Sequence, residues 1–251
     1  MSDMRASDSH GLLDTIANAF VPVHRDGYKF VAGAALGTLV LFLLWPPLGW
    51  IGAIATAYCA YFFRDPDRLT PARAGLVVSG ADGRIVDVAE AMMPPRELAL
   101  GEGTRTRVSV FLSIFDVHIV RAPVSGRIVS SVYVPGAFLN SELDKASEEN
   151  ERRALVIETS TGEKIGLVLI AGLVARRIVT FAGEGASVAR GERVGLIRFG
   201  SRVDIYLPAA ANILVAPGQT AIGGETVLAE LGPQAALGGA QGEMRSELVQ
   251  D

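Results

Sequence analysis

The sequence predicts a mainly β fold, a sandwich or half-barrel built of hairpins, preceded by an apolar helical hairpin. Two observations predict it. From Leu76 onward, short runs rich in Val and Ile alternate with Gly-containing turns, a pattern typical of all-β sandwiches and small barrels. Before these runs, the segment from Val31 to Phe63 contains no charged residue. A segment of that length without charge favours membrane-associated helices.

The uncharged segment is divided by Pro46 and Pro47 into two pieces. Each piece is about 23 Å long as a helix, shorter than the ~30 Å hydrocarbon core of a bilayer. Two interpretations fit: a pair of short helices forming a hairpin, or a single bent span. Basic residues flank both ends, among them Lys29 and Arg64, and such residues favour the cytoplasmic side. This favours a membrane-associated hairpin that enters and leaves on one face, with a buried core hairpin as the alternative.

The other boundaries follow from composition. A polar N-terminal segment, 1–30, precedes the hairpin, 31–63, and a β domain, 64–231, follows it. Residues 232–251 are rich in Gly, Ala and Gln, and we expect them to form a flexible tail.

Composition also excludes classes of function. Acidic residues number 27 and basic ones 23, for a net charge of −4. This balance argues against nucleic-acid binding, which needs a basic surface. Cys59 is the single cysteine, so an internal disulfide and a cysteine zinc cluster are excluded. With three histidines in the chain, we expect no metal centre.

The first candidate for chemistry is the pair Gly200-Ser201. A Gly-Ser pair alone indicates only a turn, but here it interrupts what otherwise is typical of one long strand, Val194 to Leu207. The serine Oγ can reach the preceding carbonyl carbon and move the acyl group from nitrogen to oxygen. The resulting ester can eliminate to dehydroalanine, which hydrolyses to an N-terminal pyruvoyl group. That sequence needs backbone strain and a nearby base.

Two further candidates are His118 and Asp82. The alternation of Val and Ile around His118 predicts a strand that also carries Asp116 on the same face. Asp82 lies in Ala-Asp-Gly, which is typical of a tight turn in which the carboxylate caps its own backbone. A structural histidine and a simple turn are the alternatives to catalytic roles.

A fourth motif, Asp144-Lys145-Ala146, is similar to the tripeptide that carries lipoyl groups. The residues after it are charged and not Val-rich, which favours a solvated loop over a carrier site at Lys145.

Taken together, these segments resemble one family, the shorter type of bacterial phosphatidylserine decarboxylase, with the related archaeal archaetidylserine decarboxylases. The resemblance covers roughly Tyr61 to Leu231. It is carried by the order and spacing of FFRDPDR (62–68), SGADGRIV (79–86), FLSIFDVHIVRAPVSGRI (111–128), FLNSELDKASEENER (138–152) and GLIRFGSRVDIYLP (195–208). The family's half-barrel units resemble lipoyl-type hybrid domains, which agrees with the predicted β fold.

The resemblance implies a proenzyme that cuts itself between Gly200 and Ser201. Residues 1–200 would form a large chain and residues 201–251 a small one, held together as a heterodimer because the strands on both sides of the cut belong to one sheet. A higher oligomer is possible. Ser201 would become a covalent pyruvoyl cofactor that forms a Schiff base with the serine amine of phosphatidylserine. Loss of CO₂ would yield phosphatidylethanolamine, with His118 as the acid/base group.

The sequence departs from the family in one respect. The longer bacterial enzymes use an Asp-His-Ser set for self-cleavage, and Asp82 and Ser201 match its outer members. The position of that histidine, three residues after His118, holds Arg121, which cannot act as a base at neutral pH. Either His118 serves both steps, or Asp82 acts on Ser201 with less help. The first alternative is favoured.

Arginine side chains suit the carboxylate and phosphate of such a substrate. Candidates for this binding are Arg121, Arg198 and Arg202. A lipid substrate also gives the apolar hairpin a purpose, since it would hold the enzyme at the cytoplasmic face of the cell membrane.

Two other functions compete with a decarboxylase. One is a non-enzymatic membrane-anchored adaptor with a lipoyl-like domain, which is disfavoured because no sustained heptad pattern for a coiled coil is present. The other is a lipoyl-like carrier that uses Lys145. Neither predicts a cut at Gly200-Ser201.

Overall fold

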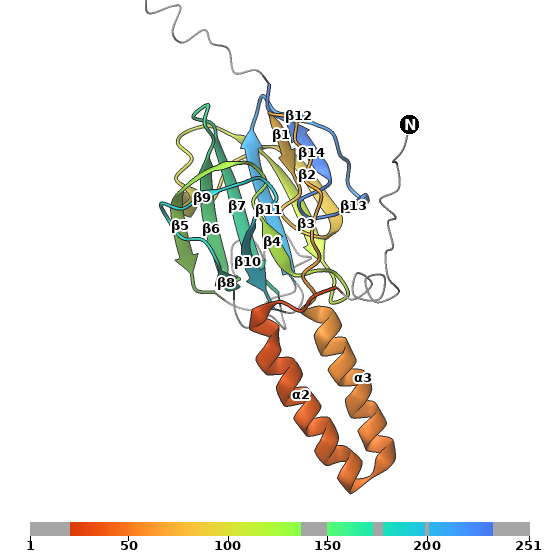
Figure 1. Cartoon of the computed structure of the whole chain (residues 1–251). Helices are drawn as coiled ribbons and strands as arrows, with labels where there is room; N and C mark the ends of the chain where they lie inside the picture. Colours follow the sequence, from red (N-terminus) through yellow and green to blue (C-terminus); the bar gives the residue numbers. More distant parts are fainter. Residues whose placement is uncertain (1–20, 137–149, 173–177, 199–200, 233–251) are drawn as a thin grey trace, which may run out of the picture. The chain divides into compact units, whose positions relative to one another are not determined.

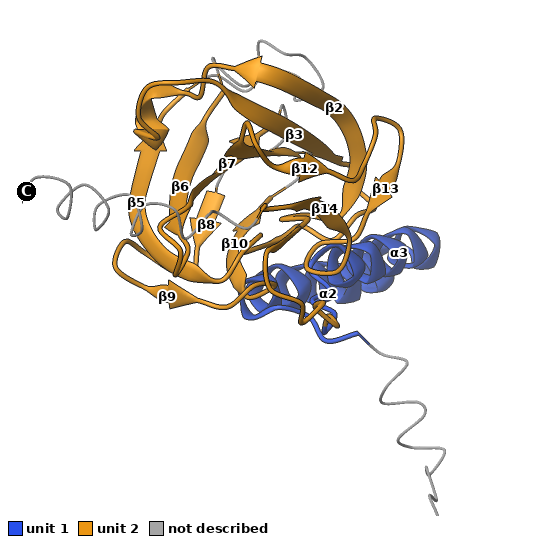
Figure 2. Cartoon of the chain, turned by 90° about the horizontal axis from the view of Figure 1, so that it is seen from above, with its two compact units in different colours: residues 1–67 blue, residues 68–251 orange. Residues whose placement is uncertain are grey.

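The computed structural model describes residues 21–136, 150–172, 178–198 and 201–232. The chain divides into two compact units, Met1–Asp67 and Arg68–Asp251 (Figures 1 and 2). The first unit is helical and the second is built of strands, so the mainly β fold with an N-terminal helical hairpin is confirmed.

The first unit is a hairpin of two helices, α2 (Arg25–Leu44) and α3 (Pro46–Phe62). Trp45 lies between them in an extended conformation, and Pro46 starts α3. Proline suits a first helical position because its φ is already helical and its missing N–H is not needed there. The alternative of a single bent span is therefore excluded. α2 begins at Arg25, so at 20 residues it is about 30 Å long, more than the apolar run alone predicted.

Small residues allow the two helices to pack closely. A Cβ on Gly49 would lie 2.2 Å from Cδ1 of Phe42, so no larger residue fits there without displacing that ring. The hydroxyls of Thr38 and Thr56 lie 2.9 Å apart across the helix pair. At the open end of the hairpin, the backbone N–H of His24 donates to the Phe63 carbonyl, which ties the two ends of the hairpin together. Close approach through small and hydroxyl residues is typical of helices that pack inside membranes.

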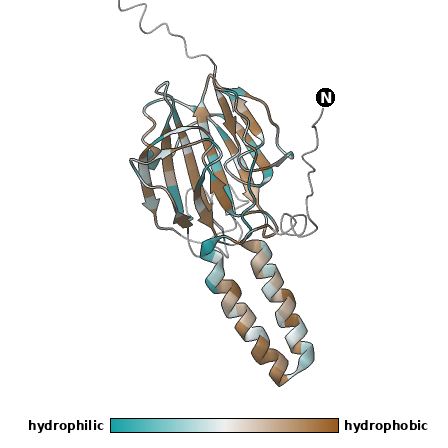
Figure 3. Ribbon diagram, viewed as in Figure 1, coloured by the Kyte–Doolittle hydropathy of each residue, from teal (hydrophilic) through white to brown (hydrophobic). Residues whose placement is uncertain are grey.

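The outer faces of the hairpin are apolar (Figure 3). Large exposed side chains include those of Leu36, Leu39, Leu43, Ile51 and Ile54. Among the described residues, α2 is the one helix long and apolar enough to cross a membrane. An exposed apolar surface of this kind is compatible with membrane association.

The described residues of the second unit form fourteen strands in three sheets and a short 3-10 helix, η1 (Arg96–Leu98). The strands are β1 (Leu76–Val78), β2 (Gly83–Met92), β3 (Arg105–Leu112), β4 (Ile119–Arg121), β5 (Gly126–Val134), β6 (Arg152–Glu158), β7 (Lys164–Ala171), β8 (Ile178–Thr180), β9 (Ser187–Val188), β10 (Arg193–Ile197), β11 (Ser201–Pro208), β12 (Asn212–Ile213), β13 (Thr220–Ala221) and β14 (Val227–Glu230).

One large antiparallel sheet dominates this unit, in the order β13-β2-β3-β11-β7-β6-β5-β9. It curls around the two small sheets, β4-β10-β8 and β1-β14-β12 (Figure 2). The main core fills the inside of the curl and includes Val203, Ile205 and Leu207 of β11. Because side chains alternate along a strand, Arg202, Asp204 and Tyr206 lie on the outer face. There Tyr206 packs with Leu98 and Leu100 in a second, smaller cluster, so β11 is buried on both faces.

Candidate active site

Ser201 is the first residue of β11, in the middle of the large sheet. It pairs with Leu112 of β3 on one side and with Ala171 of β7 on the other. The alternation along β11 places its side chain on the inner face with Val203. Ser201 is fully buried, and its Oγ has no hydrogen-bond partner within the described parts of the chain. A buried hydroxyl without a partner is costly and calls for an explanation.

The chain changes sheets just before Ser201. β10 ends at Ile197 in the small sheet, whereas β11 belongs to the large one. The long strand expected from Val194 to Leu207 is therefore two strands in two sheets, and the expectation that one sheet holds both sides of the pair was wrong. The continuous Val and Ile pattern arises because both strands are buried. Gly200 itself lies outside the described residues, as does Lys145.

His118 lies directly before β4 and is fully buried. Its carbonyl accepts a hydrogen bond from the N–H of Ile197, 3.2 Å away, which fixes His118 beside the end of β10. Its Nδ1 lies 3.0 Å from the carbonyl oxygen of Asp116. A carbonyl oxygen can only accept, so Nδ1 carries the proton in this bond, which leaves Nε2 as the nitrogen that can take up or give a proton.

The strand expected around His118 begins only after it, at Ile119, and a turn precedes the histidine. The Asp116 carboxylate accepts hydrogen bonds from both the N–H and the hydroxyl of Ser113, at 2.8 and 2.7 Å. The expectation that Asp116 shares a strand face with His118 was therefore wrong, because a local side-chain bond to the backbone competes successfully with the strand.

Asp82 lies in the turn that leads into β2. Its Oδ2 accepts a hydrogen bond from Arg68 at 2.5 Å, and its Oδ1 accepts one from the N–H of Gly223 at 2.8 Å. The sequence predicted that Asp82 caps its own turn, whereas these two bonds of its carboxylate go to Arg68 and to a second loop. Within the turn, the hydroxyl of Ser79 accepts from the N–H of Ala81. Asp82 is thus committed to a charged partner and to a second loop.

Close backbone approaches bring these segments together. A Cβ on Gly83 would lie 2.0 Å from the carbonyl oxygen of Phe111, and Gly83 has φ +148°, so only glycine fits there. A Cβ on Gly80 would lie 3.6 Å from Val203, which puts this turn against the inner face of β11. The Gly80 carbonyl also accepts from the N–H of Arg121 in β4. The Asp82 turn, β4 and the start of β11 therefore meet at one end of the curled sheet.

The three candidate arginines differ in position. Arg121 is buried and donates to the carbonyl of Gly191 at 2.9 Å. Arg198 directly follows β10, between the end of that strand and the Gly200-Ser201 pair. Arg202 lies on the outer face of β11, so the structure does not bring it together with the Ser201 side chain.

Arg202 belongs to a buried polar network that the sequence analysis missed. Its Nε donates to Asp204 at 2.6 Å, and its Nη2 donates to Ser109 at 2.8 Å. Burial, followed by the charge of Asp204, raises the pKa of Tyr206 to about 12. The sequence carries a signal for this network: Arg202, Asp204 and Tyr206 alternate with apolar residues, which places all three on one face of a strand.

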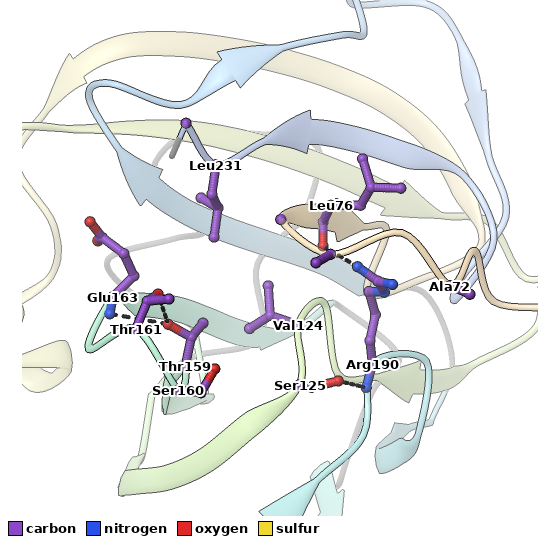
Figure 4. A pocket seen from close by; sticks show the side chains of 13 residues that line it. Ala72, Leu76, Val124, Ser125, Thr159, Ser160, Thr161, Glu163, Arg190 and Leu231 are labelled. Atoms are coloured by element: carbon purple, nitrogen blue, oxygen red, sulfur yellow. Dashed lines mark hydrogen bonds between the residues drawn. The ribbon is translucent and has the colours of Figure 1, made fainter. Parts of the chain in front are cut away.

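A cavity of about 660 Å³ lies elsewhere in this unit (Figure 4). It is lined at the turn between β6 and β7 by Thr159, Ser160, Thr161 and Glu163, with Arg190 opposite them. Ser201 pairs with the far end of β7, at Ala171. The strand from Lys164 to Ala171 covers roughly 23 Å, so this cavity is distinct from the site around Ser201. The described residues contain no group of three or more His, Cys, Asp or Glu side chains that could hold a metal ion.

Comparison with known proteins agrees with a decarboxylase site. A sequence model of the family described as phosphatidylserine decarboxylase matches residues 55–229. The chain belongs to this family, whose members are carboxy-lyases. A curated relative from Nitrobacter winogradskyi is named phosphatidylserine decarboxylase proenzyme. It is 57% identical over 209 residues, which cover 83% of this chain and 84% of the relative.

Proposed function

We propose that this chain is a proenzyme that cuts itself between Gly200 and Ser201 and then decarboxylates phosphatidylserine to phosphatidylethanolamine and CO₂. The observation that carries the proposal is the Ser201 Oγ, buried at the start of β11 and without a hydrogen-bond partner in the described regions. Family membership and the proenzyme name of the relative support it.

The cut uses the hydroxyl of Ser201 as the nucleophile. Oγ attacks the Gly200 carbonyl carbon, the C–N bond breaks, and the freed amine keeps the proton that Oγ loses. The product is an ester of Gly200 on Oγ. Elimination then removes the Cα proton of residue 201 to a base, breaks the Cβ–Oγ bond and expels the Gly200 carboxylate, which leaves dehydroalanine at residue 201. One water hydrolyses its imine form, ammonia leaves, and a pyruvoyl group remains.

The surroundings of Ser201 suit a small ketone. Residue 201 faces the apolar core with Val203, and the pyruvoyl group has no N–H or hydroxyl that would need a partner there. The group supplies a carbonyl that binds the substrate amine and withdraws electrons from the carbon that loses CO₂. Exclusion of water by the curled sheet protects this chemistry.

His118 is the residue we assign to proton transfer. Its Nδ1 is held by the Asp116 carbonyl, so Nε2 is the atom that accepts the proton of Ser201 and later delivers one to the substrate carbon. Asp82 is already paired with Arg68 and with the N–H of Gly223. This favours His118 as the base in both steps, with Asp82 as a residue that positions the turn beside β11.

The two chains would remain associated after the cut. β11 of the small chain lies between β3 and β7 of the large chain, and its backbone pairs with both. The cut end of the small chain would thus lie between two strands of the large chain, in the middle of a sheet. The apolar hairpin α2–α3 would hold the enzyme at the membrane that contains its substrate, and its basic flanks favour the cytoplasmic face.

The test is intact mass and CO₂ release with phosphatidylserine vesicles. The native chain should separate under denaturing conditions into residues 1–200 and 201–251 and release CO₂. Ser201→Ala should stay uncut and inactive. Ser160→Ala, an exposed serine at the distant cavity, is the matched control and should behave as the native chain does. A native chain that releases CO₂ while uncut would overturn the proposal.

A further inference from the structure

The turn that links β3 to His118 presents two large apolar side chains to the outside. Ile114 is 44% exposed and Phe115 is 61% exposed. These are adjacent residues at the tip of a tight turn, not scattered single side chains. An apolar pair on a protruding tip is typical of a surface that contacts another apolar phase.

The turn is held rigidly in this conformation. Four hydrogen bonds close it: two from Ser113 to the Asp116 carboxylate, one from the Asp116 N–H to the Ser113 carbonyl at 3.0 Å, and one from the Phe115 N–H to the Ser113 hydroxyl at 3.3 Å. These bonds fix the backbone of the turn from Ser113 to Asp116. The two apolar side chains are therefore carried outward by a structured frame.

The position of the turn connects it to the site. It begins one residue after Leu112, the pairing partner of Ser201, and ends two residues before His118. Ile114 and Phe115 thus lie at the same end of the large sheet as the buried hydroxyl. A surface that the turn contacts is also close to the reacting groups.

We propose that Ile114 and Phe115 insert into the interfacial region of a phospholipid bilayer and hold the start of β11 at the lipid surface. The inference rests on the proposed function, since it names how that site meets its substrate. A lipid surface is the occupant that fits, because the family acts on a phospholipid and the first unit carries an exposed apolar hairpin. Aromatic and aliphatic side chains gain free energy when they enter the headgroup boundary.

The first experiment compares two substrates with the full chain. Ile114→Ser with Phe115→Ser should lower kcat/KM about tenfold or more on vesicles of phosphatidylcholine with phosphatidylserine, because the apolar contact is lost. On monomeric dihexanoyl phosphatidylserine the change should stay within about twofold, because no bilayer is present. The matched control is Met93→Ser. Met93 is 68% exposed and directly follows β2, at the end of that strand that is remote from Ser201. The control substitution should leave both rates unchanged.

The contrary outcomes are distinct. An equal loss on both substrates would show that the turn acts on the structure of the site, and no loss on vesicles would show that it does not contact lipid. Either result overturns the inference. If the native chain fails to decarboxylate the monomeric lipid and vesicles alike, the proposed function fails instead.

A second measurement does not depend on catalysis. In a chain with Trp45→Phe and Trp50→Phe, Phe115→Trp introduces a single tryptophan, since the native sequence has two. Its emission should shift to the blue with phosphatidylcholine–phosphatidylserine vesicles and be quenched by brominated lipid. Met93→Trp in the same background should show neither effect. An unshifted spectrum at position 115 would mean that the turn contacts a protein or solvent, and the inference would be wrong.

Discussion

At the scale of single residues, the proposed site depends on one buried hydroxyl and one imidazole. Ser201 is buried without a partner for its Oγ in the described structure, and His118 is fixed by its own backbone and by Nδ1. Both were found from the sequence because they lie in motifs with a recognisable order. The partners of Asp82 could not be found in that way, because Arg68 and Gly223 are 14 and 141 residues away along the chain.

The proposed role of His118 predicts the effect of one substitution. His118→Asn keeps a side chain of similar size that can bond to the Asp116 carbonyl, but it cannot take up a proton. Self-cleavage should slow by about a hundredfold or more, in the range that general base catalysis contributes. Denaturing electrophoresis over time measures this rate. Cleavage of His118→Asn at the native rate would remove His118 from the self-cleavage step and leave Asp82 as the base.

The raised pKa of Tyr206 predicts how stability depends on pH. The pKa is about 12 in the folded chain, against 10.0 for an ordinary tyrosine. A raised folded-state pKa gives stability that is fully present below pH 10 and is lost as pH rises toward 12. The native chain should therefore lose about 2–3 kcal/mol more than Tyr206→Phe over this interval. Urea unfolding of both proteins at several pH values tests this, and parallel pH curves would contradict it.

At the scale of elements, β11 is the strand on which the whole site depends. The sequence predicted its extent from Ser201 onward well, because its apolar residues alternate with charged ones. It could not predict that β10 and β11 lie in different sheets, since two buried strands in succession have the same composition as one long strand. Pairing partners far apart in sequence decide that question.

The outer face of β11 should contribute strongly to stability. Asp204→Asn removes the carboxylate that pairs with the buried Arg202 guanidinium, and breaking a buried ion pair in this way costs about 3–5 kcal/mol. The matched control is Asp87→Asn. The Asp87 side chain pairs with Arg107 but is 38% exposed, so its loss should cost about 1 kcal/mol of stability or less. The measurement is the free energy of unfolding of the uncut Ser201→Ala chain. Equal costs for the two variants would contradict the assignment.

The place of β11 also predicts the behaviour of the two chains after cleavage. Eight residue pairs join β11 to β3 and six join it to β7. The small chain should therefore elute with the large one in size-exclusion chromatography in detergent and separate only in denaturant. Release of the small chain under native conditions would show that β11 leaves the sheet after the cut.

At the scale of the whole molecule, a helical hairpin and a curled β unit follow one another in the chain. Both were predicted from the sequence, because lack of charge and strand alternation are signals that persist over long segments. The two parts match the proposed task, since the hairpin has the exposed apolar surface and the β unit has the buried Ser201, to which we assign the cut.

The hairpin predicts an anchorage that depends on apolar contacts. Membranes that contain the chain should retain it in 1 M salt, because salt screens charges but does not weaken apolar burial. Detergent should release it. Release by salt alone would indicate a peripheral enzyme that is held by its basic flanks.

The most direct test of the central claim is the mass and N-terminal chemistry of the fragment that begins at residue 201. We predict a small chain that is lighter by one ammonia than residues 201–251 with a free serine, that resists Edman degradation and that reacts with hydroxylamine. A fragment with a free N-terminal serine, or an active chain that is continuous through residue 201, would contradict the account.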